Sequence, residues 1–133
     1  MLMAIKSAPA PEPIVGDTID EVSLWMAKFV EDNNQATHVQ FNWWLIIARP
    51  EASQEEILRA FDGKSSTNNV ELSVVSRRIQ SEGSDLDEIA RQAAFAALAD
   101  ETPCWFEVEG VVVLVPPRAT PNEVMEAYHS TAQ

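Results

Sequence analysis

Apolar side chains recur every three or four positions in two long stretches of the chain, which is the spacing of an amphipathic helix. The first stretch runs from about Thr18 to Asp32 and the second from about Leu86 to Ala99. Thr18 and Glu21 have the spacing of a capping box, in which the two side chains satisfy free backbone N–H groups at a helix start. We therefore predict one helix over each stretch. The positions at helical spacing are Ile19, Val22, Trp25, Met26, Phe29 and Val30 in the first helix and Leu86, Ile89, Ala90, Ala93 and Ala97 in the second.

Two shorter helices are predicted where serine or threonine is followed three residues later by glutamate. Pro121 would occupy the first position of one helix, where its missing N–H costs nothing. Gly63 is the predicted C-terminal stop of the other. The capping pairs are Ser53 with Glu56 and Thr120 with Glu123, and the buried stripes are Ile57, Leu58 and Phe61 in one helix and Val124, Met125 and Tyr128 in the other.

Segments 38–48 and 105–115 are extended, and two interpretations compete. Each segment is either one long strand or a hairpin, with the turns at Asn42-Trp43 and at Glu109-Gly110. Glycine accepts a positive φ angle, and strands average only about 5–6 residues, so hairpins are favoured, more clearly in the second segment. The hairpins would gather Val39, Phe41, Trp44, Ile46 and Ala48 on one face, and Phe106, Val108, Val111, Val113 and Val115 on one face of the other.

The predicted elements recur without a gap at an offset of 67 residues. Residues 45–47 align with 112–114, and residues 50–53 align with 117–120. The agreement falls on apolar, proline and capping positions, which are the positions that specify a fold. We therefore predict an α+β protein built from two tandem copies of a (β)αββα unit, packed as one pseudo-symmetric domain.

A further strand is predicted over Val70–Ile79, with a weak match at Met3–Ser7 in the first copy. Three prolines in residues 8–13 indicate a stiff link. The predicted organisation is an N-terminal strand and link over residues 1–16, the first copy over 17–66 and the second over 67–133. The element order strand–helix–hairpin–helix resembles the first five elements of a ferredoxin-like fold.

Composition and charge narrow the possible partners. The 133 residues are 46% hydrophobic and 23% charged, as in globular proteins, and 21 acidic against 9 basic side chains give a net charge of −12. Such a surface repels phosphate backbones and anionic lipid, so direct binding to nucleic acid or to a membrane is not expected. The longest apolar run, Val111–Pro117, is too short to span a bilayer. The chain does not open with a basic start followed by an apolar run, so we expect a cytoplasmic protein.

Candidate catalytic side chains are few. Cys104 and His38 are the only candidates for a nucleophile with a base, and the competing interpretation is a buried thiol and an ordinary histidine at a strand end. A single thiol and the distant His38 and His129 do not predict a metal site. Asp20-Glu21 and Asp87-Glu88 recur at helix starts. Their negative charges interact favourably there with the positive end of the helix dipole. We assign no catalytic, cofactor or metal residue, and we favour a non-enzymatic role.

The candidate interaction surface is Trp43 and Trp44 together with the basic pair Arg77-Arg78. Adjacent residues on a strand point to opposite faces, so one tryptophan is exposed unless both faces are covered, and exposed tryptophan is a common interface anchor. These features favour an acidic protein-binding module: an adaptor, an assembly factor or an inhibitor. The partner would be another protein, with a basic surface, and a homodimer is compatible with the pattern.

Two alternatives stay open at this point. The first is a nucleic-acid mimic that inhibits a basic nucleic-acid-binding partner, as a phage-encoded antagonist of host defence would. The second is a small enzyme or ligand-binding domain with its site between the two copies.

Overall fold

The computed structural model describes residues 2–9, 17–81 and 85–132. This part of the chain forms four helices and two β-sheets, so the predicted α+β class is confirmed. The chain divides into two compact units. Unit 1 comprises Met1–Lys6 and Val74–Gln133, and unit 2 comprises Ser7–Ser73.

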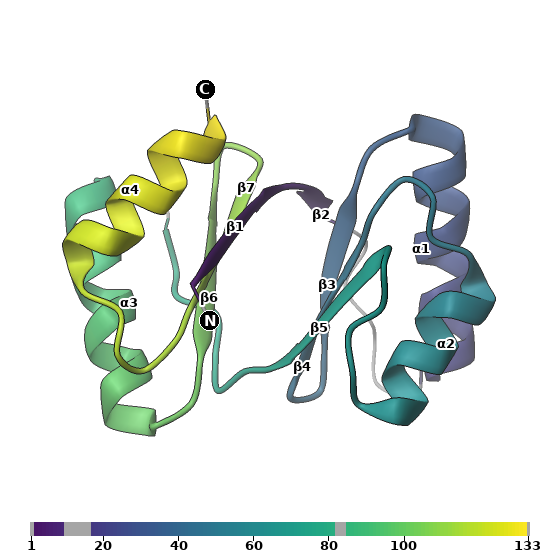
Figure 1. Ribbon diagram of the computed structural model, residues 1–133, viewed down its shortest axis with the longest axis horizontal. Coiled ribbons are helices and arrows are strands. Elements are labelled where there is room, and N and C mark those ends of the chain that lie inside the picture. The colour runs from purple at the N-terminus through teal and green to yellow at the C-terminus, as the bar shows by residue number, and fades with distance from the viewer. Residues whose placement is uncertain (1, 10–16, 82–84, 133) are drawn as a thin grey trace. The chain divides into compact units, whose positions relative to one another are not determined.

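Unit 2 is a sheet with two helices on one face (Figure 1). The strands lie in the order β2 (Ala8–Pro9), β3 (Thr37–Phe41), β4 (Trp44–Ala48) and β5 (Val70–Val74), with β2 parallel and β4 antiparallel to β3. Helices α1 (Ile19–Asn33) and α2 (Gln54–Gly63) contribute to one apolar core with the sheet. The buried members of this core are Val22, Met26, Val30, Val39, Ile46, Ala48, Ala52, Ile57, Ala60 and Val70.

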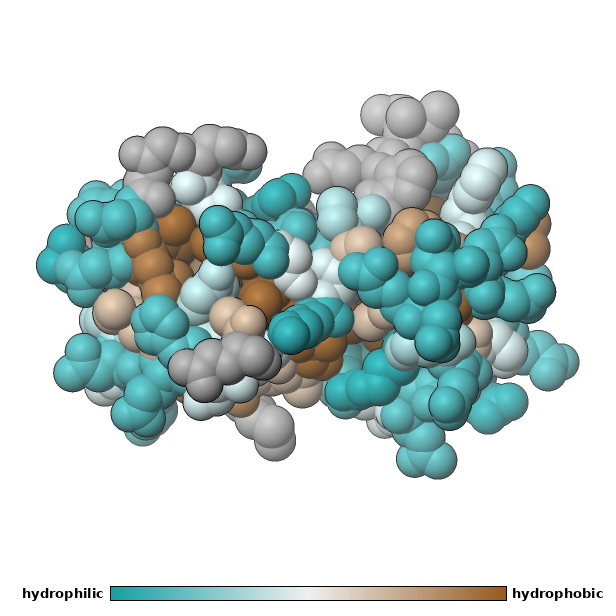
Figure 2. Space-filling model, turned by 90° about the horizontal axis from the view of Figure 1, so that it is seen from above, coloured by the Kyte–Doolittle hydropathy of each residue, from teal (hydrophilic) through white to brown (hydrophobic). Residues whose placement is uncertain are grey.

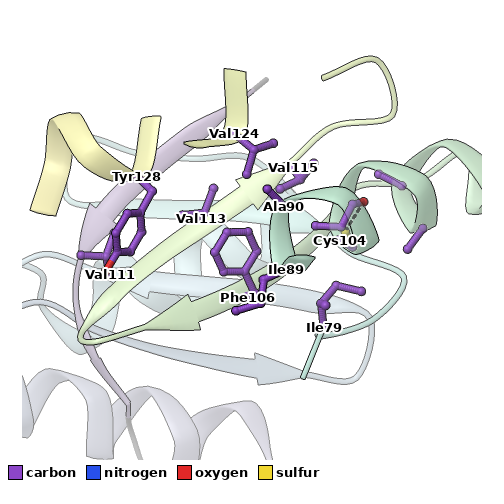
Figure 3. Packing of buried hydrophobic residues seen from close by; sticks show 13 residues of the cluster. Ile79, Ile89, Ala90, Cys104, Phe106, Val111, Val113, Val115, Val124 and Tyr128 are labelled. Carbon is purple, nitrogen blue, oxygen red and sulfur yellow. Dashed lines mark hydrogen bonds between the residues drawn. The ribbon is translucent and has the colours of Figure 1, made fainter. Parts of the chain in front are cut away.

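Unit 1 has the same kind of architecture (Figure 1). Strands β1 (Met3–Lys6), β7 (Val111–Val115) and β6 (Cys104–Val108) lie in that order, each antiparallel to its neighbour. Helices α3 (Leu86–Asp100) and α4 (Pro121–Ala132) cover one face, and Phe106 lies at the centre of the core between them and the sheet (Figure 3). The buried members are Ile79, Ile89, Ala90, Ala93, Ala96, Ala97, Cys104, Phe106, Val111, Val113, Val115, Val124 and Tyr128.

Both extended segments are hairpins, which decides between the two interpretations of the sequence. Phe41 lies opposite Trp44 in one, and Val108 lies opposite Val111 in the other. In the second hairpin Glu109 and Gly110 have φ angles of 49° and 78°, and two positive values are what a type I′ turn requires. The apolar faces predicted for the hairpins contact the two cores.

The four predicted helices are confirmed, but two details of the prediction are wrong. Trp25 has helical spacing with the core residues of α1, yet it is 63% exposed, because the neighbouring Met26 and Val22 already fill the inner face. Gly63 is the last residue of α2, and Lys64 takes the left-handed position with φ 51°. The Lys64 ammonium lies 3.6 Å from the centre of the Phe61 ring, a cation–π contact that helps a lysine occupy this position.

Two of the three predicted capping boxes are complete, and the third differs. Thr18 and Thr120 each form a complete capping box with the glutamate three residues on. Ser53 accepts a hydrogen bond from the Glu56 N–H, but the Glu56 side chain does not return to Ser53. It instead accepts hydrogen bonds from Thr67 and Asn69, so this carboxylate holds the loop before β5.

The strand predicted over Val70–Ile79 is shorter, because the backbone leaves the sheet of unit 2 after Val74. The residues that follow lie beside β6 in unit 1, where the Ile79 N–H donates to the Trp105 carbonyl at 2.7 Å. The weakly matched N-terminal strand is present as β1.

Corresponding elements of the two units begin 67 positions apart. Helices α1 and α3 begin at Ile19 and Leu86. The first strands of the two hairpins, β3 and β6, begin at Thr37 and Cys104. Strand β1 precedes the elements of unit 2 in the chain but pairs with β7 of unit 1. Unit 1 therefore takes one strand from before unit 2, whereas unit 2 is one continuous stretch of the chain.

The ferredoxin-like resemblance is not confirmed. The strands of unit 2 lie in sequential order, and β2 pairs directly with β3. A ferredoxin-like fold is built on a split βαβ, in which another strand separates the two parallel ones. The predicted boundaries at residues 16/17 and 66/67 stay predictions.

Candidate functional site

Trp43 lies in the two-residue turn between β3 and β4 and is 65% exposed. The preceding Asn42 has a φ angle of 55°, a conformation that asparagine tolerates better than most residues. The turn therefore holds a large aromatic ring at the surface on a backbone fixed by the hairpin. A rigid, exposed tryptophan is a frequent anchor in protein interfaces.

Trp44 has a different environment, although it is the next residue. Its ring is half-buried and meets the edge of Phe61 at 6.4 Å between ring centres. The ammonium of Lys64 lies 5.3 Å from the centre of the same indole. Trp44 is therefore a packing residue of unit 2, and the predicted pair separates into one exposed and one structural tryptophan.

Arg77 and Arg78 lie in unit 1 and contact acidic side chains there. Arg77 donates two hydrogen bonds to Asp100, at 3.0 and 2.9 Å, and these bonds hold the pKa of the Asp100 carboxyl below its usual range. Arg78 lies 3.8 Å from Glu107 and over the ring of Trp105. Both guanidinium groups are therefore engaged in the structure of unit 1.

The Cys104 thiol is buried and donates a hydrogen bond to the Ala93 carbonyl at 3.2 Å (Figure 3). Burial raises the pKa of the thiol from 9.0 to about 11. Only the thiolate is a good nucleophile, and little of it exists at neutral pH under these conditions. Cys104 thus behaves as a core residue.

His38 lies in unit 2 and its Nδ1 is 2.7 Å from the hydroxyl oxygen of Ser7. Both side chains are buried, so no substrate reaches this Ser–His pair. The sequence pattern did not reveal the pair, because 31 positions separate the two residues and only the pairing of β2 with β3 brings them together. The structure thus gives Cys104 and His38 separate partners, each within its own unit.

The recurring acidic pairs serve the helix starts. Glu21 belongs to the capping box of α1, while Asp87 and Glu88 pair with Arg91 one turn later, at 3.1 and 3.2 Å. Among the described residues, no group of three or more His, Cys, Asp or Glu side chains could hold a metal ion. Within the same residues, no helix is both long and apolar enough to cross a membrane.

The structure exposes further large apolar side chains that the sequence pattern did not predict to be exposed. Leu24 and Trp25 project from α1, and Phe95 and Leu98 project from α3. Hydrophilic side chains predominate on the face of each unit in Figure 2, with hydrophobic ones between them. Beside α1 a groove of about 620 Å³ is lined by the helix, from Leu24 to Asp32, and by residues 50–54.

Comparisons with protein-family models, with curated proteins and with solved structures found no match for this chain.

Proposed function

We propose that the protein is a non-enzymatic binding module that docks on another protein through Trp43. The single observation that carries the proposal is the 65% exposure of this indole in a hairpin turn. An exposed tryptophan of this size loses apolar hydration when a partner covers it. The neighbouring Trp44 is packed on Phe61, which keeps the hairpin in place while Trp43 makes the contact.

The net charge of −12 indicates the chemistry of the partner. Opposite charge steers the encounter and raises the association rate, while apolar contacts at the centre of an interface supply most of the affinity. The partner is therefore expected to present an apolar pocket for the indole within a basic surface. An adaptor, an assembly factor or an inhibitor would all use such a contact.

The test compares Trp43→Ala with Trp44→Ala. Trp43→Ala should leave the free energy of unfolding within about 0.5 kcal/mol of the wild type, because the side chain is exposed. Trp44→Ala should cost about 1–2 kcal/mol, because it removes the aromatic contact with Phe61. Urea unfolding measures both values.

Binding is measured by replacing Trp43 with a photo-crosslinking phenylalanine analogue in cells that naturally make the protein. A discrete crosslinked protein is expected from position 43, and the same analogue at the exposed Gln35 is the matched control. Equal labelling from both positions, or none from position 43, would contradict the anchor role.

A second candidate, nucleic-acid mimicry, is favoured by the net charge alone. The two candidates differ in their response to salt. Mimicry predicts that affinity for the crosslinked partner falls steeply as salt rises, whereas an apolar anchor predicts a weak dependence.

We also propose that the two units are copies of one folding pattern, related by the 67-residue offset. The equal spacing of the helix and strand starts in the two units supports this proposal. Two further positions with positive φ agree with it, since Asn34 and Asn42 correspond to Glu101 and Glu109. An experimental structure in which residues 17–62 and 84–129 fail to superpose would overturn it.

A further inference from the structure

The outward face of α1 carries two apolar side chains between charges of opposite sign. Leu24 and Trp25 are 55% and 63% exposed, Glu21 lies one turn before them and Lys28 one turn after them. Residues three and four positions apart share one face of a helix, so these four side chains form a continuous stripe. We call Glu21, Leu24, Trp25 and Lys28 the α1 stripe.

The α1 stripe is complementary to itself when two copies lie antiparallel. A twofold axis midway between Leu24 and Trp25 places each of these residues opposite the other one in the second copy. The same axis places Glu21 opposite Lys28, because both lie about 5 Å from it along the helix at 1.5 Å per residue. Two apolar contacts and two opposite-charge pairs then form in one symmetric interface, and such interfaces build most homodimers.

The exposed face of α3 lacks this property. Phe95 and Leu98 are exposed near its C-terminal end, and the charged Glu88 and Arg91 both precede them. An axis that paired Phe95 with Leu98 would place the uncharged Thr102, beyond the end of α3, opposite Arg91. Arg91 already pairs with Asp87 and Glu88 on its own helix.

We propose that the α1 stripe is the contact surface of a homodimer, with α1 packed antiparallel on α1 of a second copy. The groove beside α1 begins at Leu24 and continues past Ala27 and Lys28 towards residues 50–54. It offers space at the edge of the stripe for the Trp25 indole of the second copy. This contact does not involve Trp43 and is independent of the role proposed for that residue.

The proposed dimer is weak. The apolar part of the stripe is two side chains, well below the area of a standard interface, and Asp32 faces Asp17 at the outer ends of the helix pair. The net charge of −12 on each chain also opposes association. We expect a dissociation constant of roughly 100 µM at physiological salt.

The experiment is sedimentation velocity from about 10 µM to about 1 mM protein, a range that brackets the expected dissociation constant. The wild type should change from monomer to dimer across this range. Lys28→Glu creates two Glu–Glu pairs and Glu21→Lys creates two Lys–Lys pairs, so each variant alone should weaken the dimer at least tenfold. Phe95→Ser on α3 is the matched control and should dimerise like the wild type.

Charge exchange makes the test specific for the antiparallel arrangement. The double variant Glu21→Lys/Lys28→Glu restores opposite charges and should recover the dimer. An equimolar mixture of the two single variants should form a 1:1 heterodimer, because all four facing charges are then complementary. Glu21→Lys also removes the capping box of α1. Association in the mixture would show that this loss is not the reason why Glu21→Lys alone fails to dimerise.

Three results would overturn the proposal. The first is a wild type that stays monomeric at the highest concentration. The second is a dimer that survives Lys28→Glu but is lost in Phe95→Ser, which would place the contact on α3. The third is a failure of both the double variant and the mixture to associate.

Discussion

Neighbouring residues of one type have opposite roles in the β3–β4 hairpin. Trp43 is exposed in the turn, whereas Trp44 contacts Phe61 and Lys64. Leu24 and Trp25 show the same contrast with their neighbour Met26, which is fully buried in the core of unit 2. At this scale, the direction in which a side chain leaves the backbone decides whether a large residue stabilises the fold or is available to a partner.

The thiol of Cys104 should be unreactive in the folded protein. Its pKa of about 11 and its burial leave little accessible thiolate at pH 8. Labelling with a disulfide reagent should be slow in buffer and rapid in denaturant. Rapid labelling of the native protein would show that Cys104 is accessible.

The same thiol should make stability fall at high pH. The unfolded thiol loses its proton near pH 9, while the folded thiol keeps it until about pH 11. Since the folded state then binds more protons, the free energy of unfolding decreases as the pH rises through this interval. Urea unfolding at pH 8 and pH 10 should show a smaller decrease in Cys104→Ala than in the wild type.

Glu56 should contribute stability that disappears in acid. The hydrogen bond from Thr67, supported by those from Asn69, lowers the pKa of its carboxyl below the usual 4.5. A lowered pKa in the folded state gives stability that is present above pH 4.5 and is lost as the pH falls through the folded value. At pH 7, Glu56→Gln should unfold at a lower urea concentration than the wild type. The difference between the two unfolding midpoints should shrink below pH 4.5. A constant difference across this range would contradict the assignment.

The helices and hairpins are specified mainly by their ends. Thr18 and Thr120 close complete capping boxes at the starts of α1 and α4, and Gly110 completes the turn between β6 and β7. These local devices satisfy backbone groups within a few residues of the cap or turn. They explain why the elements have similar bounds in the sequence pattern and in the structure.

The two described glycines with open surroundings provide a matched pair of alanine variants. Gly110 has a φ angle of 78°, so Gly110→Ala should cost about 1 kcal/mol even though the added methyl group meets no atom. Gly63 is the last residue of α2 and also has open space, so Gly63→Ala should stabilise the protein by about 0.5 kcal/mol. The midpoint temperature of thermal unfolding should fall in Gly110→Ala and rise in Gly63→Ala. Equal shifts in the two variants would contradict this account of the turn.

At the scale of the whole molecule, sequence neighbours belong to different units. Strand β1 pairs with β7, which follows it by more than a hundred positions, while β2 directly after it pairs with β3. Unit 1 is therefore complete only when the start of the chain has joined its sheet. Such long-range pairing is costly in loop-closure entropy and forms slowly.

A variant that begins at Ser7 tests this arrangement. It lacks β1, so the amides of β7 that face β1 lose their partners. Hydrogen exchange should accelerate in Val111–Val115 and change little in the β3–β4 hairpin of unit 2, although Ser7 is its neighbour in the sequence. Faster exchange in unit 2 alone would contradict the pairing.

The sequence pattern by itself determined the four helices, because these depend on neighbours within one or two turns. It favoured hairpins over single long strands but did not decide between them. It also left open whether one of Trp43 and Trp44 is exposed or both are buried. Only the tertiary structure decided that Trp25 is exposed, that Glu56 binds the loop at Thr67 and Asn69, and that Ser7 meets His38. These features depend on contacts between distant segments, and periodicity carries no information about which strand pairs with which.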